Sequence, residues 1–151
     1  MRLSADYDAK SEPAAPLLGI LEQNRADFYE RGRKLDVDLL AALKAARRAK
    51  KRVLLTAGER GCHWCVILRD YFESDAELKE MRERRFVTVY AEARANMARL
   101  HNDYGPIPGT PHWFVLDDTG ALVHSQDTEL LEKGKTYDRD KMVAFLTEYG
   151  P

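Results

Sequence analysis

Both cysteines of the chain lie in one short stretch, Gly-Cys-His-Trp-Cys, at residues 61–65. An apolar run at residues 53–55 precedes this stretch, and residues 66–72 have a helical pattern. The cysteines are therefore predicted to lie where a strand passes into a helix, with Cys62 near the helix N-terminus. Free backbone amides and the positive end of the helix dipole favour a thiolate there. A second thiol at Cys65 can resolve a mixed disulfide, so the stretch suits thiol–disulfide exchange.

The length and charge of the chain restrict its class. A chain of 151 residues favours one domain with a buried core. Its 24 basic and 25 acidic residues give a net charge of −1, which argues for a soluble globular protein and against a nucleic-acid binder. No apolar run approaches the roughly 18 residues that cross a membrane. We expect a monomer that binds no nucleic acid and does not insert into a membrane.

The cellular compartment is not fixed by the cysteines. One CxxC pair cannot join distant segments, so it is not a disulfide framework. Residues 1–8 include acidic side chains and lack an apolar stretch, so no signal peptide is visible. The sequence as written indicates a cytoplasmic location, and a trimmed mature form would indicate the periplasm.

The chain is expected to divide into three parts. Residues 1–15 have the composition of a flexible leader and end in a small, Pro-rich stretch. Residues 16–35 are expected to form an N-terminal helical extension, with a short helix over about 17–30. Residues 36–151 are expected to form the main domain, which begins with a helix capped by Asp36.

Strands and helices alternate along the main domain. Strands are predicted at 52–56, 86–91, 113–116 and 121–125, and the last two form a hairpin across the turn at 117–120. Helices are predicted at 62–72, from a capping box at 74–77 to about 84, at 92–104 and after Asp138. Residues 126–137 are polar, with one helical turn expected at Leu130-Leu131. This order predicts an α/β fold whose mixed central sheet carries helices on both faces.

A loop of turn-forming residues, 105–111, ends in Gly109-Thr110-Pro111 and leads into a predicted strand. This loop, the strand before Cys62 and the Cys-His-Trp-Cys motif are three features that together resemble one known family. From about residue 36 to 149 the sequence resembles the thioredoxin superfamily. Within it, the chain is most similar to thioredoxin-like thiol:disulfide interchange proteins that carry an extra N-terminal helix.

This resemblance implies a three-layer thioredoxin-like fold and thiol–disulfide oxidoreductase activity on protein substrates. It implies that Cys62 is the attacking thiolate and that Cys65 is the resolving thiol. His63 and Trp64, between them, would tune the reduction potential, and Trp64 could equally face a substrate or pack against the helix. No bound cofactor is implied. The expected partners are protein thiols or disulfides and a second redox protein.

The resemblance also assigns a role to Thr110 and Pro111. Pro111 matches the family's cis-proline, which lies beside the cysteines. The backbone of Thr110 would then pair with an extended segment of the substrate by strand addition. These two residues are therefore predicted to form the substrate-binding edge of the site.

Two residues depart from the family pattern. Gly61 stands where many thioredoxins have tryptophan. Thr56, six residues before Cys62, stands where many have a buried aspartate that helps to move the proton of the resolving cysteine. A threonine cannot act as that base, and Glu59 or a water molecule is a possible substitute.

Two other functions fit the same residues. Cys62, Cys65 and His112 could bind copper(I) or zinc, because CxxC is also half of many metal sites. His101 and His124 stand alone in the sequence and give no such indication. The third reading is a non-catalytic thioredoxin-like interaction protein, in which Thr56 and Gly61 reflect a loss of turnover.

Overall fold

The computed structural model describes residues 28–29 and 32–151. The expected leader and nearly all of the expected N-terminal helix therefore lie outside the described residues. The first described helix is α2 (Leu35–Ala49). Asp36 was predicted to cap it, and this is wrong: the N-cap residue is Lys34, whose carbonyl accepts the amides of Val37 and Asp38. The helix begins early because Leu35 is buried in the core.

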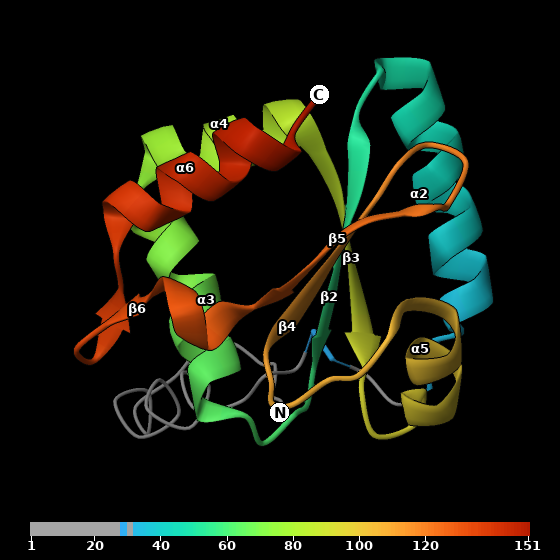
Figure 1. Cartoon of the computed structure of the whole chain (residues 1–151), viewed down its shortest axis with the longest axis horizontal. Coiled ribbons are helices and arrows are strands. Elements are labelled where there is room, and N and C mark those ends of the chain that lie inside the picture. Colours follow the sequence, from blue (N-terminus) through green and yellow to red (C-terminus); the bar gives the residue numbers. More distant parts are fainter. Residues whose placement is uncertain (1–27, 30–31) are drawn as a thin grey trace, which may run out of the picture.

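Four strands form the main sheet, in the order β3-β2-β4-β5. They are β2 (Arg52–Gly58), β3 (Phe86–Glu92), β4 (His112–Leu116) and β5 (Leu122–Asp127). β2 runs parallel to β3 and antiparallel to β4, and β4 runs antiparallel to β5. The predicted mixed sheet and the predicted β4–β5 hairpin are confirmed (Figure 1).

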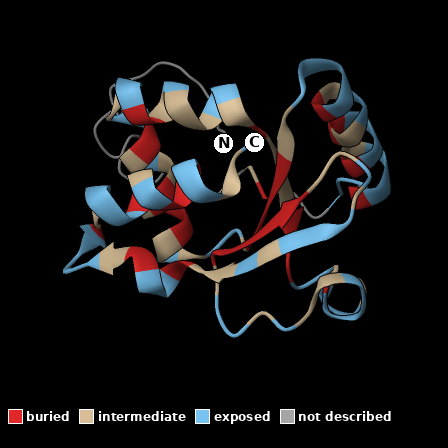
Figure 2. Ribbon diagram, turned by 45° about the horizontal axis from the view of Figure 1, so that its top comes forward, coloured by how far each residue is buried: buried red, intermediate tan, exposed pale blue. Residues whose placement is uncertain are grey.

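Helices cover both faces of this sheet, as predicted (Figure 1). On one face lie α2 and α5 (Met97–Tyr104). On the other lie α3 (His63–Glu73), α4 (Ala76–Arg85) and α6 (Arg139–Tyr149). Figure 2 shows the buried residues concentrated on the strands and on the inner sides of the helices.

The central strand β2 is longer than predicted. The sequence analysis placed its end at Thr56 and a loop from Ala57 onward, but the strand continues through Gly58. Both neighbours hold this end, because Gly58 pairs with Glu92 of β3 and Ala57 pairs with His112 of β4. A strand covered on both faces has a continuous apolar run instead of alternation, so its end has no clear sequence signal.

Two helix starts also differ from prediction. The helix predicted over 92–104 begins at Met97, because Glu92 still belongs to β3 and its buried carboxylate accepts the amide of Ala95, 2.7 Å away. The N-cap of α4 is Asp75, whose side chain accepts the amide of Leu78 at 3.1 Å. The predicted capping box began one residue too early.

The segment between β5 and α6 contains more structure than expected. The predicted helical turn lies in a 3-10 helix, η1 (Thr128–Leu131). A small hairpin of β6 (Glu132–Lys133) and β7 (Thr136–Tyr137) follows, and the sequence analysis missed it. Among the described residues, no helix is both long enough and apolar enough to cross a membrane.

Candidate redox site

Cys62 lies at the start of α3, just beyond the end of β2, as predicted. It is the N-cap residue of α3, and its backbone amide donates to the carbonyl of Glu59 at 3.2 Å. Its side chain accepts the amide of Cys65 at 3.1 Å, in the manner of a capping serine or aspartate. The helix therefore directs one of its free amides at the sulfur of Cys62.

Cys62 and Cys65 are joined by a disulfide, with their Cα atoms 5.2 Å apart. Their surroundings differ strongly. Cys62 is half-buried, whereas Cys65 is only 1% exposed and packs against Tyr29 and Val66. Of the two sulfurs, that of Cys62 is therefore the more accessible to a large reactant from solvent.

Thr110 lies against the Cys62 sulfur. Its hydroxyl is positioned to donate to Sγ at 3.4 Å, and its carbonyl oxygen lies 3.5 Å from the same sulfur. A hydrogen bond donated to sulfur favours the charged form of a thiol. In the reduced protein the Thr110 hydroxyl and the Cys65 amide would both stabilise the Cys62 thiolate.

The Thr110–Pro111 peptide bond is cis, as predicted. Pro111 is buried immediately before β4, and its carbonyl accepts a hydrogen bond from the buried hydroxyl of Thr128. The structure thus brings the CxxC motif and the Gly109–Pro111 loop together from segments far apart in the sequence.

The two residues between the cysteines differ in their surroundings. His63 is exposed on the first turn of α3. Trp64 is half-buried and makes an edge-to-face contact with Tyr137, with ring centroids 5.4 Å apart. Two roles were considered for Trp64, and the structure shows the packing contact, which is with Tyr137. Part of the Trp64 side chain remains exposed to solvent.

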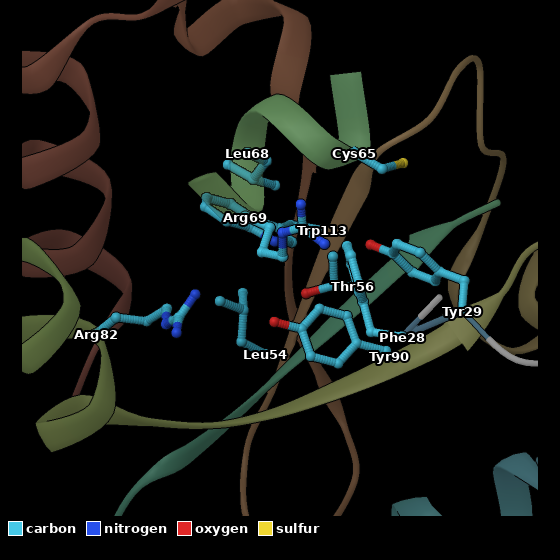
Figure 3. A pocket seen from close by; sticks show the side chains of 10 residues that line it. All are labelled: Phe28, Tyr29, Leu54, Thr56, Cys65, Leu68, Arg69, Arg82, Tyr90 and Trp113. Atoms are coloured by element: carbon cyan, nitrogen blue, oxygen red, sulfur yellow. The ribbon is translucent and has the colours of Figure 1, made fainter. Parts of the chain in front are cut away.

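Thr56 stands where many thioredoxins have a buried aspartate. Thr56 is buried and lines a small cavity that also reaches Cys65 (Figure 3). Glu59, one of the two substitutes considered for the missing acid, pairs with Arg94 at 3.2 Å and does not line that cavity. Glu59 is therefore poorly placed to take the proton of Cys65.

The residues considered for a metal site do not gather. Within the part of the chain that the structure describes, no group of three or more His, Cys, Asp or Glu residues could hold a metal ion. His112 is buried, and its Nε2 lies 2.8 Å from the hydroxyl of Ser125. Its ring contacts Phe114, on the sheet face covered by α2 and α5 and away from α3.

Sequence reasoning missed two residues of the site. Tyr29, from the segment before α2, is 1% exposed and packs against Cys65. Thr128, at the start of η1, supports the cis-proline through its bond to Pro111. Neither stands in a motif, and the only available signal for Tyr29 was the aromatic pair that it forms with Phe28 in a polar stretch.

Comparisons with known proteins agree with this geometry. A family described as thioredoxin-like matches residues 34–118, more than half of the chain. A search of curated protein sequences found no match. A disulphide isomerase from Xylella fastidiosa Temecula1 has a similar structure, with a TM-score of 0.68 and 19% identity over 80% of this chain and 94% of that one.

A second solved structure is the oxidised C-terminal domain of DsbD from Neisseria meningitidis. It aligns with a TM-score of 0.53 and 19% identity, over 76% of this chain and 95% of that one. At such identities the two structures show a shared fold. The family match and the Cys62–Cys65 pair support thiol–disulfide oxidoreductase chemistry in general. The chain therefore belongs to the thioredoxin-like family.

Proposed function

We propose that this protein is a thiol–disulfide oxidoreductase that exchanges disulfides with protein substrates and a redox partner protein. The observation that carries the proposal is the difference between the two sulfurs. The Cys62 side chain is half-buried, and its sulfur accepts hydrogen bonds from the Cys65 amide and the Thr110 hydroxyl. The Cys65 side chain is almost completely buried. Cys62 is the nucleophile and Cys65 the resolving thiol. His63 and Trp64 tune the reduction potential, and Thr110 and Pro111 form the docking edge.

The reaction needs no bound cofactor, because the sulfurs carry the electrons. The Cys62 thiolate attacks a substrate disulfide, forms a mixed disulfide and releases one substrate thiolate. Cys65 loses its proton and attacks Cys62, which breaks the bond to the substrate and forms the Cys62–Cys65 disulfide. The substrate is reduced by two electrons and the protein is oxidised by two. The reverse sequence donates a disulfide.

The test is the reduction potential of the Cys62–Cys65 pair, measured by equilibration against a series of glutathione redox buffers with a chelator present. Relatives range from about −270 mV for reducing members to about −120 mV for strong oxidants. A value near the first limit would indicate a reductase or relay, and a value near the second a disulfide donor. Absence of a reversible disulfide would overturn the proposal.

A variant completes the test. Cys62→Ser should abolish exchange with a protein disulfide while circular dichroism shows an unchanged fold. Exchange activity that survives this substitution would mean that Cys62 is not the nucleophile.

A further inference from the structure

One end of the molecule carries a cluster of basic side chains from two segments. The first segment runs from the last turn of α2 into β2, and the second is the last turn of α4. They lie side by side, because Arg52 and Phe86 pair in register at the starts of β2 and β3, and Lys51 donates to the carbonyl of Glu83 at 2.6 Å. We call this cluster the basic end, and it consists of Arg47, Arg48, Lys50, Lys51, Arg52, Arg84 and Arg85.

The charges of the basic end are not neutralised by carboxylates. Within the part of the chain that the structure describes, none of its seven side chains forms an ion pair. Arg47, Lys51 and Arg52 donate to backbone carbonyl oxygens, which carry no net charge. Three side chains that make no such bond are exposed, namely those of Arg48, Lys50 and Arg84. The basic end therefore presents positive charge to whatever approaches it.

Among the described residues, few acidic side chains lie at this end. Glu83 pairs with Arg82 at 3.7 Å. The others are Asp117 and Asp118, in the turn between β4 and β5, and Glu148, near the end of α6. Seven cations against these three carboxylates give the basic end a net charge of +4, although the whole chain has −1. The rest of the chain is therefore net negative, and the charge of the protein is separated along the sheet.

The basic end lies at the opposite end of the sheet from the cysteines (Figure 1). β2 begins at Arg52 in the basic end and finishes at Gly58, shortly before Cys62 at the start of α3. Seven residues of strand span about 20 Å, at roughly 3.3 Å per residue. A large partner that covers the basic end thus leaves Cys62 facing away from it.

The arrangement of the cations fits a flat anionic surface. They come from the ends of two helices at one level of the sheet, since the first residues of β2 and β3 pair with each other, so several can meet one plane together. Anionic lipid headgroups present such a plane and attract clusters of Lys and Arg. Nucleic acid fits less well, because residues 47–52 and 82–85 contain no aromatic side chain to stack on bases.

We propose that the basic end binds the surface of an anionic phospholipid membrane by electrostatic attraction, and so holds the CxxC site facing away from the lipid. The binding is peripheral: side-chain cations contact headgroups, and no segment inserts. It makes and breaks no covalent bond and does not depend on the proposed thiol–disulfide exchange. Its effect is to confine the protein to a membrane surface while Cys62 stays accessible from solution.

The test is co-sedimentation of the full chain with lipid vesicles. Vesicles of phosphatidylcholine alone are compared with vesicles in which phosphatidylglycerol replaces a third of it. We expect binding to the second kind only. Salt should release the protein, because raising it from about 0.1 M to about 1 M shortens the Debye length from about 10 Å to about 3 Å. No binding to the anionic vesicles, or equal binding to both kinds, would overturn the proposal.

Two matched triple variants locate the binding surface. Each cation near an anionic surface contributes a factor of about five to binding, so replacing three of them should weaken it about 100-fold. The basic-end variant combines Arg48→Gln, Lys50→Gln and Arg84→Gln. The control removes the same charge from exposed positions of the β6–β7 hairpin and α6, by Lys133→Gln, Lys135→Gln and Lys141→Gln. It should bind nearly as the wild type does, and equal weakening in both would contradict a local surface.

Lysine acylation reads the orientation in the unmodified sequence, whatever the folding of the variants. Bound vesicles should protect Lys50 and Lys51 from an acylating reagent, as measured by mass spectrometry, and leave Lys133 and Lys135 as reactive as in the free protein. Protection of the hairpin lysines instead would overturn the proposal. Tighter binding to a random-sequence DNA duplex or oligonucleotide than to anionic vesicles at the same salt would also overturn it, and would assign the basic end to nucleic acid.

Discussion

The two sulfurs of one short motif have different neighbours. Cys62 takes the place of a capping side chain at the start of α3, and Thr110 approaches it from the cis-proline loop. Cys65 lies one turn further on, against Tyr29 and the sheet. The two sulfurs thus differ in their hydrogen bonds and in their exposure to solvent.

Thr110→Val should make Cys62 less reactive in the reduced protein. The substitution keeps the shape of the side chain and removes the hydroxyl that lies 3.4 Å from the sulfur. A hydrogen bond to a charged group contributes about 1.5–3 kcal/mol, so we expect the thiolate population near neutral pH to fall about tenfold. The pH dependence of alkylation by iodoacetamide measures it.

The control for this prediction is Thr136→Val, at an exposed position of β7. It should leave the alkylation profile unchanged. An unaltered profile in Thr110→Val itself would mean that the Thr110 hydroxyl makes no bond to the thiolate.

At this scale the sequence predicts some residues and misses others. Cys62, Cys65 and Pro111 stand in motifs whose spacing carries the information. Tyr29 and Thr128 enter through contacts across the fold, with Cys65 and with the carbonyl of Pro111. Such contacts depend on how the chain returns to the site, and no local pattern encodes them.

Helices and strands were predicted well in kind and order, and less well at their ends. The end of β2 depends on pairing with two other strands, and the start of α5 depends on the carboxylate of Glu92 binding the amide of Ala95. The β6–β7 hairpin has only two residues in each strand, too few for alternation to show. Element ends are thus set by tertiary contacts that local patterns do not contain.

The N-cap of α6 was predicted correctly, and it gives a prediction at the scale of the element. The Asp138 carboxylate accepts the amide of Lys141 at 3.2 Å. Replacing such a cap by alanine costs about 1 kcal/mol. Asp138→Ala should therefore lower the melting temperature by roughly 2–4 °C, as followed by circular dichroism.

Asp140→Ala is the comparison for this cap. Asp140 lies in the first turn of α6, where its charge has a weaker, salt-screened interaction with the helix dipole. We expect a smaller loss of stability than for Asp138→Ala. Equal losses would show that charge near the helix N-terminus matters and the cap bond does not.

One titratable side chain, the imidazole of His112, lies in the interior of the molecule. His112 is 3% exposed, within the core that α2 and α5 close over the sheet. Burial lowers the pKa of His112; nearby Asp127 acts in the opposite direction and His124 in the same one. The folded protein therefore holds this imidazole neutral at a pH where the unfolded chain protonates it.

Stability should consequently depend on pH in a defined window. Below the unfolded value of about 6.5, the unfolded state binds a proton that the folded state does not, so the free energy of unfolding falls as the pH falls. Above that value both states are neutral and this dependence vanishes. Urea unfolding of the oxidised protein at about pH 5.5 and 7.5 should show lower stability at the lower pH.

His112→Gln should flatten this dependence, whatever its effect on stability at the higher pH. His101→Gln is the control, because His101 is exposed on α5. It should keep the wild-type pH dependence. A wild-type slope in His112→Gln would assign the effect to other groups. Asp75 and Asp117, whose pKa values are lowered chiefly by hydrogen bonds from Arg139 and Thr119, act only at more acidic pH.

The sealed position of Cys65 also makes the protein a tool for finding its own partners. Under the proposed function, Cys65→Ser would leave Cys62 able to attack a substrate and would remove the thiol that releases it. Such a variant would carry its substrates as covalent adducts, from which the peptide attached to Cys62 could be read directly.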